Sequence, residues 1–372
     1  MFAGVFKDKV VWLSGHTGFK GAWLATWLLR LGARVHGFSL PPPTQPALFE
    51  QLGLANRISH ELGDIRNAET VARSLRATQP DFVFHLAAQA LVRPSYAEPL
   101  ITYDTNVMGT ANVLDALRSL TKDCAAVMVT TDKCYENLER VHPYAESDHL
   151  GGHDPYSSSK AGAELVISAY RRSFLNATPV RVASARAGNV IGGGDWALDR
   201  ILPDCIRALQ RGEPIGVRNP DATRPWQHVL EPLSGYLWLA ALLSRPELLG
   251  LDRAAVSSAF NFGPELEANR RVGDVVEEVL RHWPGRWTRP ETRSALHEAR
   301  LLMLDTTKAK QVLHWRPGWN FEAAIGRTVN WYQHTHRDPA AAESLTLADI
   351  SAYEQAAHAA GIAWAVKNGV RA

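Results

Sequence analysis

Short apolar runs alternate with helical patterns through the first half of the chain. The predicted strands are residues 10–13, 34–38, 82–86, 125–130 and 180–185, and the predicted helices are residues 21–31, 69–77, 107–120 and 158–173. Strands that are apolar on both faces and separated by helices are typical of a parallel sheet covered on both sides. The pattern therefore predicts an α/β fold with a doubly wound parallel sheet, whose ligands bind beyond the carboxyl ends of the strands.

The rhythm changes at about residue 188, where glycine- and proline-rich connections begin, such as GNVIGGGDW and RNPDATRPWQ. Residues 1–187 are expected to form the sheet-bearing domain. Residues 188–372 are expected to form mainly a smaller, mixed α/β substrate-binding lobe with C-terminal helices. The helical pattern at 230–243 and the segment AFNFG, within about 225–262, are expected to return to the sheet.

Composition excludes several classes of protein. Hydrophobic residues make up 46% and charged residues 21% of the chain, and 40 basic against 38 acidic side chains leave a net charge of +2. No global field would recruit nucleic acid or an anionic membrane, and no run approaches a membrane span or a signal peptide. Three scattered cysteines, Cys124, Cys134 and Cys205, are too few for a disulfide framework or a zinc site. We expect a cytoplasmic protein without a metal.

The segment SGHTGFKG follows the first predicted strand and opens the first predicted helix. Its glycines, Gly15, Gly18 and Gly21, allow a tight turn, close approach of the backbone to a pyrophosphate and close packing of the helix on the strand. An ordinary strand-to-helix turn is the alternative, but the surrounding βαβ pattern favours a phosphate cradle. Residues 1–187 are therefore predicted to be a dinucleotide-binding domain of the Rossmann type.

The acidic residue that usually holds the adenosine ribose, about 20 residues after such a loop, is missing. The second predicted strand runs into Ser39 and Leu40 instead. A serine hydroxyl can bind the ribose but would not exclude a 2′-phosphate, so the spacing leaves NAD and NADP open. Asp64, in GDIR, is either an acceptor for the adenine amino group or a plain turn carboxylate.

Lys20 lies in the first turn of the first predicted helix. The helix dipole opposes a cation there unless a phosphate is bound. Lys20 is therefore either a further contact to the pyrophosphate or a solvated lysine.

Two further segments, TTDKCYEN and PYSSSK, carry reactive side chains. Tyr156 and Lys160 stand at i and i+4 on one helix face, where a cation lowers the pKa of a phenol from about 10 towards the range of a general base. Such a pair alone is typical of a surface, but the upstream cradle makes it specific. Asp132 and Lys133 directly follow a predicted strand, at the sheet edge where ligands bind, and their alternative interpretation is a solvated charge pair.

Together these segments resemble the extended short-chain dehydrogenase/reductase superfamily, over nearly the whole chain. The motifs occur in the superfamily's order: GHTGFKG, GDIR, HLAAQ, TNVMGT, TTDK, YSSSKAGAE, NVIGGGDW and RPWQHV. Within the superfamily the sequence is most similar to the 4,6-dehydratases of CDP-glucose. The residues that indicate this branch are Thr131, Asp132, Lys133, Lys20, Trp196 and Trp226. The dTDP-glucose enzymes carry Glu where this chain has Lys133, which favours the CDP-sugar branch.

The resemblance implies a reaction in three stages. Tyr156 would take the proton of the sugar 4-hydroxyl as hydride passes to NAD, with Lys160 holding the ribose and polarising the phenol. The 4-ketone acidifies the C5 proton, which Lys133 would help remove while Asp132 protonates the departing C6 hydroxyl. Lys133 can be a base only when neutral, so we expect it to be desolvated. Return of hydride to C6 would give CDP-4-dehydro-6-deoxy-D-glucose for deoxysugars of surface polysaccharides such as O-antigen.

The resemblance also implies sets of binding residues. The catalytic set is Thr131, Asp132, Lys133, Tyr156 and Lys160. The NAD contacts are Gly15, Thr17, Gly18, Phe19, Lys20, Gly21, Ser39, Asp64, Ile65, Leu86, Ala87, Ala88, Asn106, Thr130, Tyr156 and Lys160. The CDP-glucose contacts are Gln89, Arg93, Asn189, Arg200 and Arg224, because guanidinium groups suit phosphate geometry. His85 is interpreted as a core histidine, and Trp226 or Phe262 either stacks on a base or packs in the core.

Other functions share parts of this pattern. A 4-epimerase, or a dehydratase for dTDP-glucose or GDP-mannose, would use the same cradle and Tyr–Lys pair, but an epimerase needs no acid–base pair for elimination. A non-catalytic dinucleotide-binding regulator could lose Tyr156 or Asp132 without penalty. The resemblance implies a homodimer built on helices 107–120 and 158–173, or a homotetramer of two such dimers.

Overall fold

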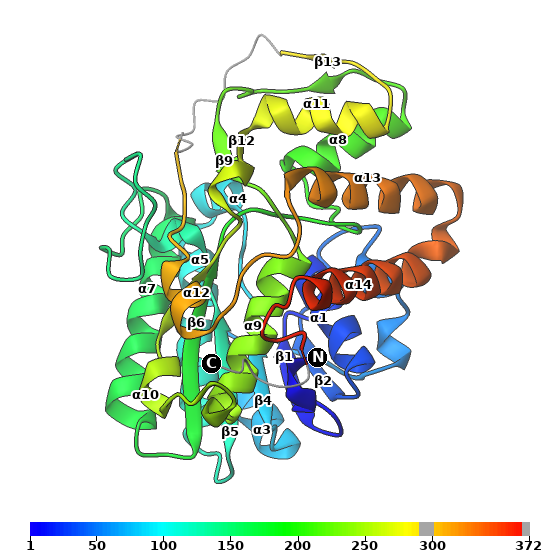
Figure 1. The fold of residues 1–372 in the computed structure, drawn as a ribbon. Coiled ribbons are helices and arrows are strands. Elements are labelled where there is room, and N and C mark those ends of the chain that lie inside the picture. Colours follow the sequence, from blue (N-terminus) through cyan, green and yellow to red (C-terminus); the bar gives the residue numbers. More distant parts are fainter. Residues whose placement is uncertain (290–300, 367–372) are drawn as a thin grey trace.

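A seven-stranded sheet lies at the centre of the structure, and all its neighbouring strands are parallel (Figure 1). The strand order is β11-β6-β5-β4-β1-β2-β3. The strands are β1 Val10–Ser14, β2 Arg34–Ser39, β3 Ser59–Leu62, β4 Phe82–His85, β5 Cys124–Val129, β6 Val180–Ala187 and β11 Ala259–Phe262. The structure, a computed structural model, describes residues 1–289 and 301–366. Its architecture confirms the predicted doubly wound α/β fold.

Helices cover both faces of the sheet. One face carries α1 Phe19–Arg30 and α9 Leu230–Ser244, and the other carries α3 Ala68–Thr78, α6 Gly109–Leu117 and α7 Pro155–Tyr170. Strand β1 shows the reason, because Val11 and Leu13 enter the first apolar core while Trp12 enters the second. A strand that is apolar on both sides must be covered on both sides, so the apolar runs of the sequence predict this layering.

The predicted elements differ from the observed ones mainly at their ends and at one sheet edge. The predicted helix 107–120 is preceded by a π-helical turn, η3 Asp104–Met108, that runs into α6. The edge strand β3 is absent from the prediction because its sequence, SHEL, is polar and largely exposed. The predicted return of AFNFG is confirmed, since β11 pairs with β6, and α9 packs on β5 and β6.

The second half of the chain adds a smaller assembly, in the upper part of Figure 1. Its helices α8 Ile201–Gln210, α11 Val272–His282 and α13 Phe321–Arg337 enclose an apolar core of their own. Three two-stranded sheets accompany them: β7 Val190–Ile191 with β10 Gln227–His228, β9 Thr223–Pro225 with β12 Asn269–Arg271, and β8 Ile215–Gly216 with β13 Trp287–Thr288. The boundary at residue 188 stays a prediction, and residues 290–300 and 367–372 of the predicted lobe lie outside the described residues.

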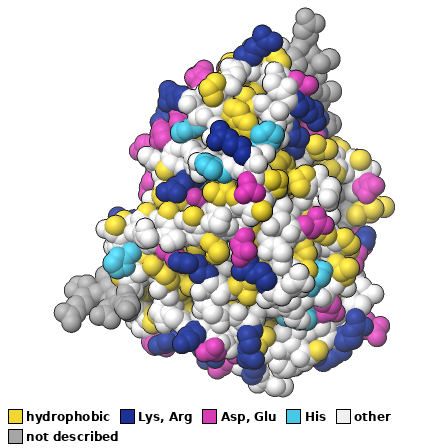
Figure 2. Space-filling model, turned by 90° about the vertical axis from the view of Figure 1, so that its right-hand side faces the viewer, with side chains coloured by type: hydrophobic (Ala, Val, Ile, Leu, Met, Phe, Trp, Pro, Cys, Tyr) yellow, Lys and Arg dark blue, Asp and Glu magenta, His cyan; other side chains and the backbone are white. Residues whose placement is uncertain are grey.

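The remaining helices are short connections, except the last one. They are α2 Leu48–Gln51, α4 Val92–Ala97, α5 Pro99–Tyr103, α10 Arg253–Val256, α12 Thr307–Val312 and α14 Ala342–Ala359. Among the described residues, no helix is long and apolar enough to span a bilayer. In the same part of the chain no group of three His, Cys, Asp or Glu side chains is arranged to hold a metal. The face on which α13 and α14 lie carries interspersed charges of both signs (Figure 2).

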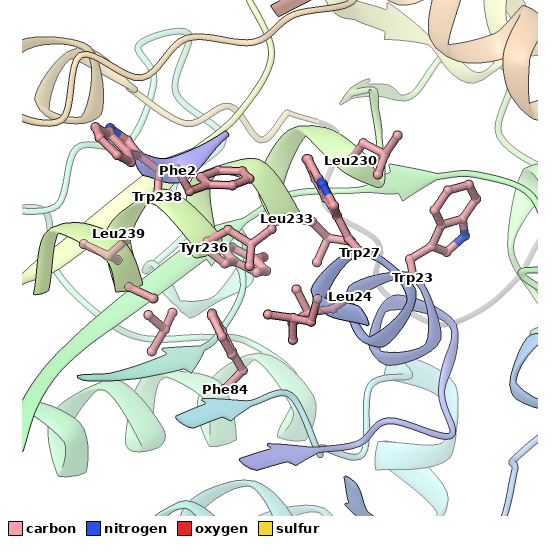
Figure 3. Close-up of a cluster of buried hydrophobic side chains, with 14 of the residues drawn as sticks. Phe2, Trp23, Leu24, Trp27, Phe84, Leu230, Leu233, Tyr236, Trp238 and Leu239 are labelled. Carbon is pink, nitrogen blue, oxygen red and sulfur yellow. The ribbon is translucent and has the colours of Figure 1, made fainter. Parts of the chain in front are cut away.

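Phe2 and Trp27 lie in a buried apolar cluster with Leu233 and Tyr236 of α9 (Figure 3). Trp364, near the other end of the chain, belongs to the same cluster. Phe2 stacks on Trp364 with ring centroids 4.8 Å apart and meets Trp27 edge-on at 5.6 Å. The Trp27 indole and the Arg30 guanidinium both donate hydrogen bonds to Glu354 of α14. Trp27 thus packs in the core, and its N–H anchors the C-terminal helix to α1.

A second buried carboxylate, Glu231, fastens α14 to α9. It accepts hydrogen bonds from the Tyr353 hydroxyl at 2.6 Å and from the backbone N–H groups of Gly318 and Trp319 at 2.9 and 2.7 Å. Burial raises the pKa of Glu231 to about 7, although these hydrogen bonds lower it. The folded protein therefore holds this proton more tightly than an unfolded chain does.

Glu231→Gln is expected to change how stability depends on pH. The folded-state pKa of Glu231 lies above its ordinary value of 4.5, so its stabilising contribution is full below about pH 4.5 and is lost as pH rises through about 7. Over that range the wild type should lose up to about 3 kcal/mol of unfolding free energy that the variant keeps. Urea titrations at several pH values measure this. Glu322→Gln, at an exposed carboxylate, is the control, and identical pH slopes for Glu231→Gln and wild type would contradict the prediction.

Candidate active site

The predicted catalytic residues meet beyond the carboxyl end of β5. The strand leads through Thr130 into a short 3-10 turn that carries Asp132 and Lys133. The Thr131 hydroxyl donates to Asp132 Oδ1 at 2.9 Å and accepts from the backbone N–H of Lys133 at 3.4 Å. Thr131 thus fixes the turn, and its side chain orients the carboxylate next to it.

Asp132 is buried, with 1% of its surface exposed. Burial raises the pKa of its carboxyl above the ordinary value, against the charges of Lys133, Arg224 and Lys20 and the Thr131 hydrogen bond. Its Oδ2 has no hydrogen-bond partner within the described residues. A Cβ at Gly188 would lie 2.9 Å from that oxygen, so glycine leaves the free side of the carboxyl open. These features suit a protonated acid whose proton is available to a ligand.

Tyr156 and Lys160 come from the first turns of α7. The Asp154 side chain caps the helix by accepting from Ser157 N–H at 2.9 Å, and Pro155 occupies the first turn. Tyr156 N–H donates to the Ser95 hydroxyl at 3.1 Å, and Lys160 Nζ donates to the carbonyl of Val129 at 3.4 Å. The tyrosine and lysine are both buried and face the end of β5.

The pKa of the tyrosine departs from the prediction. Burial raises the pKa of Tyr156 to about 12, while a hydrogen bond with Thr131 and the charge of Arg200 lower it. The predicted lowering of the Tyr156 pKa below about 10 is therefore wrong, because burial outweighs the neighbouring cation. Burial also lowers the pKa of Lys160 to about 8, so the cation itself is costly to keep.

Lys20 and Lys133 are both half-buried side chains. The expected desolvation of Lys133 stays a prediction. Lys20, whose Nζ lies 3.5 Å from the Tyr236 hydroxyl and 5.8 Å from that ring's centroid, has its pKa lowered by burial to about 8. The alternative of a solvated Lys20 is therefore wrong, because its ammonium points toward Tyr236 and acts on Asp132. A contact between Lys20 and a pyrophosphate stays a prediction.

The glycine loop has the close backbone approach that the sequence predicts. Gly15 has a left-handed φ of +77°, and a Cβ there would meet the backbone N of Ala87 at 2.7 Å. A Cβ at Gly21 would meet the carbonyl oxygen of Gly15 at 2.1 Å. Gly18 is the N-cap of α1 and has no side chain to cap the helix. Phe19, the first residue of the helix, is half-buried. The first N–H groups of the helix are thus left for a ligand.

The end of β2 is filled by hydroxyl and imidazole groups. Thr17 Oγ1 and Ser39 Oγ lie 2.8 Å apart, and Thr17 also donates to the Leu40 carbonyl at 2.9 Å. The buried His16 lies 2.7 Å from His60, between their Nε2 and Nδ1 atoms. Burial, followed by the charge of His60, lowers the pKa of His16 to about 3. Two hydroxyl groups and the neutral ring of His16 therefore occupy the position of the missing acid.

The side chains of several predicted cofactor residues bond to other groups of the protein around the site. Asp64 forms a bidentate pair with Arg66, at 2.9 and 2.6 Å from Nε and Nη2, and the arginine's hydrogen bonds lower the pKa of Asp64. The Asn106 amide bonds both backbone groups of Gln89 and the Ser159 hydroxyl, so it ties the loop after β4 to α7. Ile65, also predicted, is buried against Gly109. The last predicted residues of this set are Leu86, Ala87 and Ala88. The backbone N–H groups of Leu86 and Ala87 donate to the Ser14 hydroxyl.

The predicted substrate residues divide into two groups. The Gln89 amide is used within its own loop, by Leu91 and Thr102. Arg93 pairs with Asp199 at 3.2 Å. Arg200 pairs with Asp195 at 2.8 Å.

Arg200 and Arg224 also act on the catalytic residues. The charge of Arg200 lowers the pKa of Tyr156, and that of Arg224 lowers the pKa of Asp132. Asn189 is half-buried between β6 and β7. The structure thus brings Arg200 and Arg224, but not the Gln89 amide, into electrostatic reach of the catalytic residues.

The ambiguous core candidates are settled by their contacts. His85 is confirmed as a core histidine, since its ring lies 2.8 Å from the Ser14 hydroxyl and 3.2 Å from that of Thr110. Trp226 donates to the Arg270 carbonyl in the core of the second assembly. Phe262 packs edge-on against Trp315 with centroids 5.0 Å apart. Both rings are core residues.

Two groups next to the site are not predicted from the sequence. One is Tyr236 of α9, which contacts Lys20. The other is the buried ion pair of Glu164 and Arg186, 2.8 Å apart. A signal was available for Glu164, which stands at i+4 from Lys160 in YSSSKAGAE and so shares its helix face.

Comparisons with known proteins agree with this geometry. The family model described as GDP-mannose 4,6 dehydratase matches residues 13–328. A CDP-glucose 4,6-dehydratase of Salmonella typhimurium is 44% identical over 335 residues, covering 88% of this chain and 91% of that protein. A CDP-paratose 2-epimerase of Salmonella typhi is 31% identical, covering 86% and 98%.

The fold has solved counterparts. The structure of a dTDP-glucose 4,6-dehydratase of Streptomyces venezuelae with NAD bound superposes with a TM-score of 0.71 at 25% identity, covering 89% of this chain and 99% of that one. Together with the matched family model and the 44% identical relative, this confirms the resemblance to the extended short-chain dehydrogenases/reductases. The chain belongs to the nucleotide-sugar dehydratase family that the GDP-mannose 4,6 dehydratase model defines.

Proposed function

We propose that the protein is a CDP-glucose 4,6-dehydratase that uses NAD. The observation that carries this proposal is the buried Asp132, with its raised pKa, next to the buried Tyr156–Lys160 pair. An epimerase needs the tyrosine and lysine but no acid for elimination, so Asp132 favours a dehydratase. The 44% identical relative, a CDP-glucose 4,6-dehydratase, supports the choice of sugar nucleotide. The product would enter deoxysugar synthesis for surface polysaccharides.

The residues around the glycine loop fit a dinucleotide. A side chain at Gly15 or Gly21 would clash with backbone atoms, so the cradle is built of backbone at these positions. The uncapped start of α1 supplies N–H donors for a pyrophosphate. Ser39 and Thr17 would hold the adenosine ribose. The relative solved with NAD bound supports this cofactor over NADP. When bound, NAD supplies the hydride acceptor for C4, the hydride donor for C6 and a positive charge.

The chain's own residues supply the proton transfers. Tyr156 takes the proton of the 4-hydroxyl, and Arg200 is the cation of the chain that lowers the pKa of this phenol. Lys133 removes the C5 proton of the 4-keto sugar. Asp132, whose pKa is raised by burial, gives its proton to the C6 hydroxyl, which leaves as water. Arg224 and Arg200 bind the diphosphate, where bidentate guanidinium contacts are favourable.

The buried cysteines suggest where the enzyme works. Cys124, Cys134 and Cys205 are all free thiols in apolar surroundings. Such thiols persist in a reducing compartment. We therefore propose a cytoplasmic location.

The substrate proposal predicts a ranking of nucleotide sugars. With saturating NAD, the protein should form a 4-keto sugar from CDP-glucose, detected by its absorbance after addition of base. dTDP-glucose and GDP-mannose, tested in parallel, should react at least about tenfold more slowly, which corresponds to about 1.4 kcal/mol in transition-state binding. Faster turnover of either rival would reassign the nucleotide, and a C4 epimer without a keto product would replace the dehydratase by an epimerase.

The division of roles predicts separable variants. Asp132→Asn cannot donate the proton and should lower kcat about 100-fold or more. Lys133→Ala should slow the exchange of solvent deuterium into C5 together with water loss, which mass spectrometry of the product measures. Ser147→Ala, in the neighbouring loop, is the control. Normal elimination by Lys133→Ala would remove this lysine from the mechanism.

We further propose a homodimer through α5, α6 and α7. Apolar side chains are exposed on this side of the molecule, and they are Leu100, Ile101, Tyr103, Met108, Leu165 and Phe174. A contiguous set of this kind is typical of a protein interface. A tetramer would pair two such dimers.

Sedimentation velocity tests the dimer with two matched leucines. Leu165→Glu, at a side chain 61% exposed on α7, should convert the dimer to monomer. Leu62→Glu, 59% exposed on the edge strand β3, should leave it unchanged. A wild type that sediments only as monomer would refute the proposed assembly.

A further inference from the structure

A buried carboxylate lies directly behind the Tyr156–Lys160 pair. Glu164 is 3% exposed and stands one helical turn after Lys160 on α7. It accepts hydrogen bonds from Thr130 Oγ1 at 2.5 Å, Ser184 Oγ at 2.8 Å and Arg186 Nη2 at 2.8 Å. All of its partners thus belong to β6 or to the end of β5. The carboxylate joins the catalytic helix to the strand ends that carry the rest of the site.

The arginine of this pair is held just as firmly. Arg186 Nη1 donates to the Tyr135 hydroxyl at 2.8 Å, and that hydroxyl donates to Asn261 Oδ1 at 2.7 Å. Asn261 in turn donates to the carbonyls of Tyr144 and Asp305. A fixed network of this kind leaves the Glu164 carboxylate little freedom to move away from Lys160.

The surroundings show why Lys160 needs an anion. Its ammonium is buried, and burial lowers its pKa to about 8, while the charge of Glu164 is the larger of two influences that raise it. The other is the Cys134 thiol, which is inert because burial raises its pKa well above the ordinary value. The charge of Lys160 contributes to lowering the pKa of Lys20 on α1. Burial and then the charge of Lys160 lower the pKa of His85 on β4. Glu164 is thus the anion that stabilises this cation.

Glu164 remains ionised in this position. Burial opposes its charge, but Arg186 and the hydrogen bonds of Thr130 and Ser184 bring its pKa below the ordinary value. On its far side the ion pair lines a cavity of about 490 Å³ whose other charged groups are Glu146, Asp148, Arg171 and Lys308. The carboxylate is therefore a permanent negative charge at neutral pH.

We propose that Glu164 is a positioning residue of the catalytic pair, whose fixed carboxylate keeps Lys160 protonated during turnover. A protonated Lys160 would bind the cofactor ribose through charge-assisted hydrogen bonds, which a neutral lysine cannot make. This inference rests on the proposed function, because it assigns a role within the same reaction. Glu164 itself touches neither the substrate nor the reacting atoms.

The direct test is the titration of Lys160 by NMR. The chain has nine lysines, so ¹³Cε-lysine labelling gives few signals, and Lys160→Arg assigns the relevant one. Glu164→Gln should lower the pKa of Lys160 by about one unit or more. Ser184→Ala removes a hydrogen bond from the same carboxylate without changing its charge, and should leave that pKa unchanged. An unchanged Lys160 pKa in folded Glu164→Gln would overturn the proposal.

A second variant guards against loss of folding. Glu164→Gln leaves the Arg186 guanidinium buried without its ion partner, which is strongly destabilising. Glu164→Gln combined with Arg186→Met removes both charges, and the same fall in the Lys160 pKa is expected. An unchanged pKa in this double variant would equally overturn the proposal.

Kinetics distinguish positioning from structural damage. The basic limb of the kcat profile should move to lower pH by the same amount as the Lys160 pKa, with kcat recovering towards wild type at acidic pH. A loss of kcat that is equal at all pH values would contradict the role. The NMR titration needs no substrate, so a wild type that fails to dehydrate CDP-glucose would refute the proposed function alone.

Discussion

Desolvation at the carboxyl end of the sheet is the constraint on which the site depends. Asp132, Tyr156 and Lys160 are each buried. Burial raises the pKa of the acid and of the phenol and lowers that of the lysine, so it favours the neutral form of all three. For Asp132 this shift is useful, because an acid must carry its proton. For Lys160 it is a cost, which the charge of Glu164 partly offsets. One low-dielectric site therefore favours the protonated form of an acid and opposes the charge of a cation that the reaction needs.

The sequence predicts those parts of the fold and site that depend on local pattern. The central strands are apolar on both faces, and the glycines of the cradle are required by backbone contacts such as that of Gly15 with Ala87. The edge strand β3 is not predicted, because an exposed SHEL segment resembles a loop. Desolvation is also beyond a linear pattern. The desolvation of the Lys20 ammonium depends on α9, which brings Tyr236 from more than half the chain away.

Several charged groups predicted to face ligands are paired within the protein. Asp64 holds Arg66, Arg93 holds Asp199 and Arg200 holds Asp195. Motif spacing identifies the residue type but does not reveal such a partner, since the partners come from other loops or from the following residues. The exposed pairs are weak, because water screens both charges and side-chain entropy opposes them. The Arg93–Asp199 pair is of this exposed kind, whereas Arg200, proposed to bind the diphosphate, would have to give up a buried partner.

The mechanism places a particular demand on the cradle. Hydride leaves C4 and returns to C6 in one turnover, so the cofactor must stay bound while the sugar loses water. The ribose end of this cradle offers the hydroxyls of Thr17 and Ser39, already 2.8 Å apart, in place of a carboxylate. Neutral hydrogen bonds are weaker than those to a charged acceptor. With the proposed contacts, retention of NAD depends more on the pyrophosphate end and on Lys160. The charge of that lysine, and hence the proposed role of Glu164, then bears on holding the cofactor as well as on the chemistry.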